Sequence, residues 1–429
     1  MKEGKTVGNC LVLLTKTYPY AKGEEFIEDE IPRLAESFEK IIILATSVPD
    51  GAVQTRHTPQ NVSCHAVFAR VIKRSLPVNA LSLFPFTDCG GFADNAEREA
   101  LRGNLKRRAY LCYFIAKAKG VAHECARFLR KYDLSAFEGV TFYAFWFYDV
   151  AMAACWLRDL CKNPVKKAVC RAHSYDLYPS GSLTPGYLPL RRYLLEHIDA
   201  VYPCSQNGTD YLSSHYPPYA RKIHTAYLGT RDYDLSPVKT DETIELVSCC
   251  HLAPHKRIDL LAKSLSFLSD LHRPIHWVHF GTGEGLEDLK KYAEEHLGFM
   301  KTEFPGFIRN EDLMRYYQTH PVDWFLNVSS QEGLPVSIME ACSFGIPVIA
   351  TDVGGTSEIV RGGETGYLLP ADFAPEDLAK LLRRQFLAEP EAHERLRLNC
   401  RRLWQELFSA DVNFARFAQE LAPQEKSIL

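Results

Sequence analysis

The chain has 429 residues, 46% of them hydrophobic, and a formal net charge of -3. This length exceeds one ordinary core and favours two domains, and the apolar content excludes wholesale disorder. The charge is unevenly spread, because residues 1–235 carry an excess of Lys and Arg and the remainder carries an excess of Asp and Glu.

The first half alternates apolar strands with helical spacing. We expect strands at residues 9–15, 41–46, 140–145, 168–172 and 200–203, which predicts a doubly wound arrangement. Residues 98–131 are rich in Lys and Arg between apolar residues and predict one or two amphipathic helices with a cationic face. A solvated face and a peripheral contact with an anionic membrane both fit this pattern, whereas its aromatic residues resemble a core rather than a nucleic-acid interface.

A polar, proline-containing segment, residues 230–242, is the expected interdomain linker. A second strand series follows at 244–249, 275–280, 323–328 and 347–350, and amphipathic helices are expected at 375–386 and 391–407. The sequence therefore predicts an α/β protein with two Rossmann-like parallel-sheet domains that face each other across a cleft. We place the domains at 1–235 and 236–404, followed by a helical tail, 405–429, that packs back on the N-terminal domain.

The thirteen cysteines show no framework spacing and no Cys-x-x-Cys pair. With no signal peptide and no transmembrane-length apolar run, this predicts reduced thiols in a cytoplasmic protein. No spacing of His, Cys and Asp resembles a metal cage, so we expect no metal and no cofactor.

Residues 325–370 contain the most informative pattern. Glu332 and Glu340 are separated by seven residues, with the turn Gly333-Leu334-Pro335 between them and a second glycine turn, Gly354-Gly355, after the next strand. Ligands of parallel sheets bind at the carboxyl ends of the strands, where helix N-termini favour anions. Two carboxylates beside a phosphate site suit a ligand that combines phosphate with hydroxyl groups, as a nucleotide sugar does.

Two further residues follow strand ends. Lys256 comes after the strand at 244–249, where a mobile cation could meet a diphosphate, and His173 comes after the strand at 168–172, with Asp176 close by. The run Gly281-Thr-Gly283-Glu-Gly285 lacks the third glycine of a dinucleotide fingerprint and fits a tight turn better. This disfavours an NAD-dependent oxidoreductase.

The segment 244–370, with its Glu-x7-Glu spacing, Glu-Gly-x-Pro and Pro-Val-Ile-Ala-Thr-x-x-Gly-Gly elements, resembles glycosyltransferase family 4. These are the group 1 retaining transferases of the GT-B fold. Residues 15–32 and 171–178 are similar to the branch that builds bacterial exopolysaccharides and surface glycans.

The resemblance implies a role for each matching residue. Glu332 would contact hydroxyls of the donor sugar, and Glu340 would bind the ribose. The backbone of the turn formed by Gly333, Leu334, Pro335 and Val336 would hold the sugar and distal phosphate through its N–H groups. Lys256 would neutralise the diphosphate, and the loop at Gly23 would meet the phosphates. His173 would stabilise an oxocarbenium-like transition state. His251 stands where the family usually has an arginine, and Gly23 stands alone where many relatives have two glycines.

The expected activity is metal-independent, retaining transfer of a hexose or related sugar from a nucleotide-diphosphate sugar, with UDP favoured. The acceptor would be a glycan or polyprenyl-linked glycan of surface polysaccharide biosynthesis, used at the inner face of the plasma membrane. Two alternatives are a nucleotide-sugar-binding scaffold of a glycan-assembly complex and a nucleotide-sugar 2-epimerase.

Overall fold

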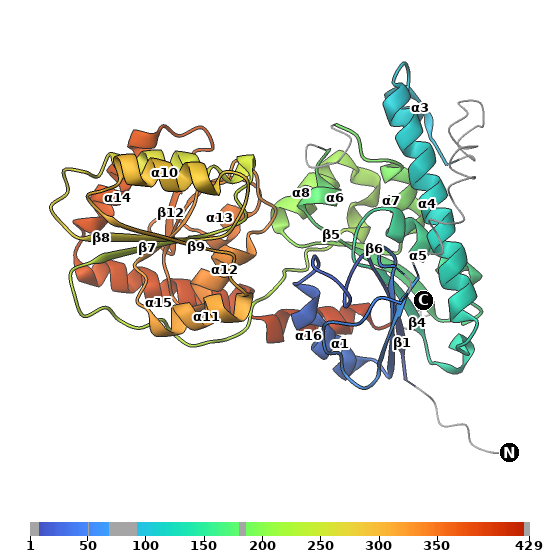
Figure 1. Ribbon diagram of the computed structural model, residues 1–429. Coiled ribbons are helices and arrows are strands. Elements are labelled where there is room, and N and C mark those ends of the chain that lie inside the picture. The colour runs from blue at the N-terminus through green and yellow to red at the C-terminus, as the bar shows by residue number, and fades with distance from the viewer. Residues whose placement is uncertain (1–7, 50, 68–91, 180–185, 424–429) are drawn as a thin grey trace. The chain divides into compact units, whose positions relative to one another are not determined.

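The computed structural model describes residues 8–423 except residue 50 and the ranges 68–91 and 180–185. The chain forms two compact units (Figure 1). Unit 1 comprises Met1–Ala226 and Asp411–Leu429, and unit 2 comprises Tyr227–Ala410. The chain therefore leaves unit 1 before the boundary expected at residue 235, and it returns after the one expected at residue 404.

Unit 1 is built on a six-stranded parallel sheet in the order β3-β2-β1-β4-β5-β6. Its strands are β1 (Cys10–Thr15), β2 (Lys40–Ala45), β3 (Val62–Ala66), β4 (Val140–Ala144), β5 (Lys166–Ala172) and β6 (Ala200–Pro203). Its helices are α1 (Ile27–Ser37), α3 (Asn95–Ala100), α4 (Leu105–Leu129), α5 (Asp149–Leu160), α6 (Ser174–Leu177), α7 (Arg191–His197), α8 (Gln206–His215) and α16 (Ala410–Leu421), with 3-10 turns at Leu134–Ala136 and Pro217–Lys222.

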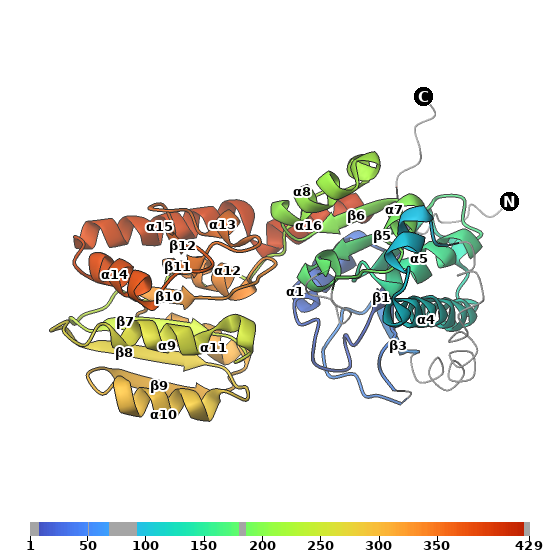
Figure 2. The same ribbon diagram turned by 90° about the horizontal axis from the view of Figure 1, so that it is seen from above.

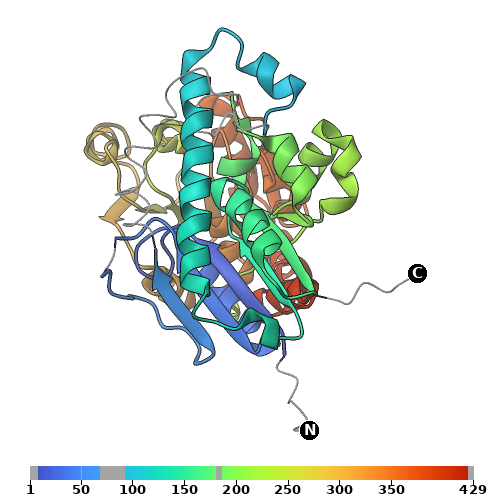
Figure 3. The same cartoon turned by 90° about the vertical axis from the view of Figure 1, so that its right-hand side faces the viewer.

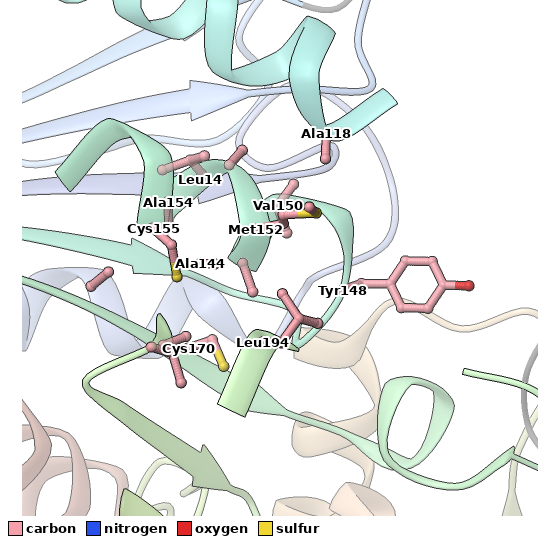
Figure 4. Packing of buried hydrophobic residues seen from close by; sticks show 14 of the residues in the cluster. Leu14, Ala118, Ala144, Tyr148, Val150, Met152, Ala154, Cys155, Cys170 and Leu194 are labelled. Atoms are coloured by element: carbon pink, nitrogen blue, oxygen red, sulfur yellow. The ribbon is translucent and has the colours of Figure 1, made fainter. Parts of the chain in front are cut away.

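The two faces of this sheet are covered by different helices. Val12 and Leu14 of β1 pack into a cluster with α4, α5 and α7, part of which Figure 4 shows. Leu11 and Leu13, which alternate with them, face α1 and α16 instead. Burial on both faces explains why the central strands are continuous apolar runs. Figure 3 shows α4, the long turquoise helix, running along the unit.

The helix α16 returns the chain to unit 1. Its Phe417, Ala418 and Leu421 are buried in the same cluster as β1 and α1. Beneath it, Arg171 forms a fully buried ion pair with Glu30 at 3.0 Å, and its guanidinium lies 4.0 Å from the Phe417 ring. Tyr143 donates a second hydrogen bond to Glu30, so this buried carboxylate is both paired and hydrogen-bonded.

Unit 2 repeats the architecture, with strand order β12-β11-β10-β7-β8-β9, which can be followed in Figure 2. Its strands are β7 (Ile244–Cys249), β8 (Ile275–Phe280), β9 (Lys301–Gly306), β10 (Trp324–Asn327), β11 (Val348–Thr351) and β12 (Gly366–Leu369). Its helices are α9 (Ile258–Ser266), α10 (Leu286–His296), α11 (Asn310–Thr319), α12 (Val336–Ser343), α13 (Thr356–Ile359), α14 (Pro375–Phe386) and α15 (Pro390–Leu407), with a 3-10 turn at Pro254–Lys256.

The segment expected as a linker is packed within unit 2. The N–H of Thr230 donates to the Phe408 carbonyl at 3.0 Å, and the N–H of Ser236 donates to the Phe344 carbonyl at 2.9 Å. The buried Arg397 donates to the Ser236 carbonyl as well. These hydrogen bonds fix the polar segment within unit 2, although its composition alone predicts a linker.

The basic stretch forms the short helix α3 and the 25-residue helix α4. On α4, Arg107 donates to the carbonyls of Ala100 and Gly186 and is therefore a structural residue. Lys106, Arg108 and Lys119 are exposed. No helix in the described part of the chain is both long and apolar enough to cross a bilayer.

Candidate functional site

The centre of the unit 2 sheet is its topological switch point. The connections from β7 lead to β8 and β9 on one side, whereas β10 lies on the other side of β7. Loops after the two central strands diverge and leave room for a ligand at the carboxyl edge. Lys256 lies in the loop after β7, and Glu332 lies in the loop after β10.

The structure brings these two predicted residues together. The Lys256 Nζ lies 2.6 Å from the Glu332 Oε1, and their side chains are 20% and 10% exposed. Asn327, the last residue of β10, donates from Nδ2 to the same carboxylate oxygen at 3.3 Å. The pair is thus fixed at the edge of the sheet and still reachable from solvent.

Arg257, which was not predicted from the sequence, anchors the loop that carries Lys256. Its guanidinium donates to the carbonyls of Val328, Ser329 and Ala371 at 2.7, 3.1 and 2.5 Å. These carbonyls belong to the loops after β10 and β12. Arg257 thereby joins three strand ends, and its left-handed backbone (φ 51°) starts α9 directly after Lys256.

Glycines permit the close approach of these loops. A Cβ on Gly354 would lie 2.1 Å from the Glu332 carbonyl oxygen, and the φ of Gly354 is +57°. The N–H of Gly355 donates to the Gly333 carbonyl at 2.6 Å. On the other side of β7, a Cβ on Gly281 would lie 1.8 Å from the Cys250 carbonyl oxygen, so these glycines form the tight turn that the sequence predicts.

The turn after Glu332 leads into α12, which starts at Val336. The first N–H groups to bond within the helix are those of Ile338 and Met339, both to the Pro335 carbonyl. The earlier N–H groups form a helix N-terminus suited to an anion. Pro335 has no N–H, so the donors available in this turn come from Gly333, Leu334 and Val336.

Glu340 lies on the second turn of α12 and is half-buried. Its Oε1 accepts a hydrogen bond at 2.6 Å from Nδ2 of Asn310, the first residue of α11. Glu340 and Glu332 therefore have different polar neighbours, although one short segment supplies both. Asn310 was not predicted from the sequence.

His251 is exposed at the start of the loop after β7. It lines a pocket of about 910 Å³ between α9 and α10, whose floor includes Ile258, Ala262 and Leu289. Lys256 and Glu332 do not line this pocket. Burial lowers the pKa of the neighbouring His255, and the charge of Lys256 lowers it further.

In unit 1, His173 follows β5 and is only 7% exposed. Its ring lies 4.8 Å from the ring of Phe145 and 5.0 Å from that of Trp146. Burial lowers the pKa of His173 to about 3, and the charges of Arg171 and Lys16 act in the same direction. The imidazole is therefore neutral, and its buried Nε2 has no hydrogen-bond partner among the described residues.

Asp176 holds the backbone rather than the imidazole of His173. Its carboxylate accepts from the N–H of His173 at 2.5 Å and from the N–H of Phe147 at 2.6 Å. Burial raises the pKa of Asp176 to about 6, against the effect of these N–H donors. The residue joins the loops after β4 and β5 and so sets where His173 lies.

In the loop at Gly23, backbone N–H groups already donate hydrogen bonds to carboxylates of the protein. Gly23 (φ +92°) donates its N–H to Glu25 at 2.7 Å. The buried Glu24 accepts from the N–H groups of Lys16, Thr17 and Tyr18 at 2.7 to 2.8 Å. A phosphate that used these donors would have to replace a carboxylate.

Across the described residues, no group of three or more His, Cys, Asp or Glu side chains is placed to hold a metal ion.

Comparison with known proteins finds a matching family model over part of the chain and a matching fold. Residues 233–403 match the family model described as glycosyl transferases group 1. The chain is 37% identical over 108 residues to the O-antigen biosynthesis glycosyltransferase WbnH of Escherichia coli, an alignment that covers 25% of the chain and 28% of that relative. It is 25% identical over 216 residues to the putative colanic acid biosynthesis glycosyltransferase WcaL of Salmonella typhimurium, covering 49% of the chain and 53% of WcaL.

The alignments with these curated relatives thus span from less than a third to about half of their length. A solved structure of Anabaena Alr3699/HepE, in complex with UDP and glucose, matches with a TM-score of 0.64 at 16% identity, over 96% of the chain and 99% of that protein. The fold is therefore GT-B, with two Rossmann-like domains.

Replacing Gly354 with Ala should displace the Glu332 loop, because the new Cβ would meet the Glu332 carbonyl at 2.1 Å. A shift of about 1 Å in a positioned group costs roughly a hundredfold in rate, so we expect that loss in any turnover that uses Glu332. The matched control is Gly362→Ala, whose Cβ meets nothing within 4 Å. Equal turnover of the two variants would contradict the role given to the close approach.

Proposed function

We propose that the chain is a retaining, metal-independent glycosyltransferase that uses a nucleotide-diphosphate sugar, with a UDP-sugar favoured. The observation that supports this most directly is the Lys256–Glu332 pair at the switch point of unit 2, inside the segment that matches the glycosyl transferases group 1. A cation and a carboxylate 2.6 Å apart suit a ligand that presents phosphate to one and hydroxyls to the other.

The proposed reaction transfers a sugar to a hydroxyl of the acceptor. The acceptor oxygen forms a bond to the anomeric carbon, and the bond from that carbon to the diphosphate oxygen breaks with its electron pair. The proton of the acceptor hydroxyl passes to the departing diphosphate. Negative charge develops on the leaving group, so Lys256 and the N–H donors at Gly333, Leu334 and Val336 stabilise the transition state more than the ground state.

The remaining roles follow from the neighbours of each residue. Glu332 accepts hydrogen bonds from the donor sugar, and its contact with Lys256 loosens when diphosphate takes a share of the ammonium. Glu340, held by Asn310, accepts from the ribose hydroxyls. His173 is neutral, so it can face the positive charge of an oxocarbenium-like transition state without repelling it.

The acceptor is a glycan or polyprenyl-linked glycan of surface polysaccharide biosynthesis. The names of the relatives WbnH and WcaL, which refer to O-antigen and colanic acid, favour this acceptor class. We further propose a peripheral contact with an anionic membrane through α4. Near its start, the exposed Arg102, Lys106 and Arg108 accompany Leu105, which is 73% exposed.

Donor binding tests the function first. We expect the Tm of the protein to rise with one series among UDP-, GDP-, ADP- and dTDP-sugars, and the rise to persist in EDTA, because fixed cations replace a metal. Lys256→Ala should abolish the rise. Lys256→Ala and Glu332→Ala should each lower kcat by roughly 10²–10³-fold.

Lys290→Ala is the matched control, because Lys290 forms an exposed ion pair with Glu287 at 2.8 Å in the same unit. Wild-type rates in Lys256→Ala or Glu332→Ala would contradict their assignment. No Tm rise with any donor would favour the scaffold alternative. Conversion of a donor to its 2-epimer without acceptor would favour the epimerase.

We expect His173 to affect the rate of turnover and to be uncharged in the folded protein. We expect His173→Gln to lower kcat while the Kd for the donor stays unchanged. The folded pKa of about 3 lies below the usual value near 6.5, so the unfolded chain binds more protons between these values and His173 destabilises the fold as pH falls through that window.

The free energy of unfolding, measured by urea denaturation at pH 7 and pH 5, should therefore fall more in the wild type than in His173→Gln. The difference should approach about 1.4 kcal/mol per pH unit. An equal fall in both proteins would show that the pKa of His173 is the same in the folded and unfolded chain, which would contradict the neutral role.

Charge reversal tests the membrane contact. The triple variant Arg102→Glu, Lys106→Glu, Arg108→Glu should no longer sediment with phosphatidylglycerol vesicles, because each basic residue near such a surface contributes about 1 kcal/mol. The control triple Lys290→Glu, Lys291→Glu, Lys380→Glu changes the charge equally on exposed or half-buried residues of unit 2. Absence of vesicle binding in the wild type would end this part of the proposal.

A further inference from the structure

The ammonium of Lys16 lies against three aromatic rings at the carboxyl edge of the unit 1 sheet. Its Nζ is 4.6 Å from the ring centre of Trp146, 5.1 Å from that of Tyr175 and 5.7 Å from that of Tyr148. No described residue accepts a hydrogen bond from it. Aromatic faces attract a cation but leave the N–H donors of the ammonium unused. This half-buried lysine is therefore ready to bind an anion.

A buried carboxylate directly follows Tyr148 in the chain. Asp149, 1% exposed, begins α5 and forms an ion pair with Lys117 of α4 at 3.2 Å. Neither of its oxygens meets the geometry of a hydrogen bond with any described group. Burial lowers the pKa of Lys117, but the ion pair with Asp149 and the neighbouring Tyr113 and Tyr175 together outweigh this effect, and the pKa is raised. A buried carboxylate with such incomplete partners has capacity for further donors.

Tyr148 precedes Asp149 in the chain, and the centre of its ring lies 5.7 Å from the Lys16 ammonium. Its hydroxyl is buried without a hydrogen-bond partner among the described residues, although its ring packs edge-on against Phe114 at 5.1 Å. Figure 4 shows Tyr148 pointing away from the aliphatic cluster around Met152 and Leu194, with the hydroxyl at its far end. Its polar end is thus directed away from the core.

These residues meet because of the strand order. Lys16 follows β1, Trp146 to Asp149 follow β4, and Tyr175 follows β5. β1 and β4 are the central neighbours from which the unit 1 sheet winds in both directions, so their carboxyl ends form its switch point. His173, with its unpartnered Nε2, contacts the same Trp146 at 5.0 Å.

We propose that this cluster binds an anionic sugar unit of the acceptor, with Lys16 on its carboxylate or phosphate and Asp149 accepting from its hydroxyls. The proposal rests on the proposed glycosyltransferase function and specifies its acceptor. Faces of Trp146 and Tyr175 suit the C–H surface of a sugar ring. The Asp149 carboxylate disfavours a bare diphosphate, which has no hydroxyl to donate to it.

Binding of three small probes, measured by titration with ligand-observed NMR, tests this inference: methyl glucuronide, glucose 1-phosphate and methyl glucoside. We expect the wild type to prefer an anionic probe over the glucoside, and the stronger of the two anions identifies carboxylate or phosphate as the group. Lys16→Met should weaken the anionic probes by about tenfold or more and leave the glucoside unchanged. Asp149→Asn should weaken all three.

The control is Lys131→Met, because Lys131 also lies over an aromatic ring, that of Phe128 at 4.7 Å, but near the far end of α4. If Asp149→Asn does not fold, the comparison of Lys16→Met with Lys131→Met still tests the inference. Equal binding of charged and neutral probes, or no effect of Lys16→Met, would overturn the inference. So would a loss of the UDP-induced Tm rise in Lys16→Met with probe binding intact, since Lys16 would then serve the donor.

The Tm rise with nucleotide sugars separates the two proposals. A donor response with none of the expected probe binding would overturn the anionic acceptor alone. Probe binding as expected without a response to any donor would leave an anionic-sugar site on a protein that lacks the proposed activity.

Discussion

Backbone-to-backbone contact between neighbouring strand ends is the constraint on which the candidate donor site depends. The turn at Gly354 packs against the carbonyl of Glu332, and Gly281 packs against that of Cys250. Both approaches are so close that a Cβ at either glycine would clash with the carbonyl oxygen. Arg257 adds a guanidinium to the same junction. The loops after β7 and β10 are thereby held together, and only with these loops in place can Lys256 reach Glu332. The Lys256–Glu332 pair therefore depends on the close backbone packing of the loops around it.

The sequence predicted the central strands well and the edge strands poorly. β7 and β8 begin and end where they were expected, because apolar runs buried on both faces are visible without tertiary information. β6 is the one edge strand that was found with its bounds, because it too is a mostly buried apolar run. β3, β9 and β12 were missed. β9 alternates exposed and half-buried residues and contains a proline, and β3 is only partly buried throughout. Such edge segments become strands because a neighbour offers its hydrogen bonds, which composition does not record.

At the candidate sites, the residues that could be predicted from the sequence are those that follow buried strands. Lys256, Glu332 and His173 could be found because the carboxyl edge of a parallel sheet is a known location for chemistry. The residues that hold or complement them could not. Asn310 meets Glu340 from another helix, Glu24 folds its carboxylate over the loop after β1, and Lys16 lies among aromatic rings from two further loops. Each contact joins segments whose spacing along the chain has no pattern.

The return of α16 to unit 1 has a consequence for the order in which the protein folds during synthesis. Unit 2 is one uninterrupted stretch, 227–410, whereas unit 1 needs residues 411–421 to cover Leu11, Leu13 and the pair of Arg171 with Glu30. A ribosome that has completed unit 2 still presents an unfinished unit 1, with one face of its sheet open. The first half of the chain is therefore the last to reach its final packing, and the apolar face of its sheet stays uncovered for longest during synthesis.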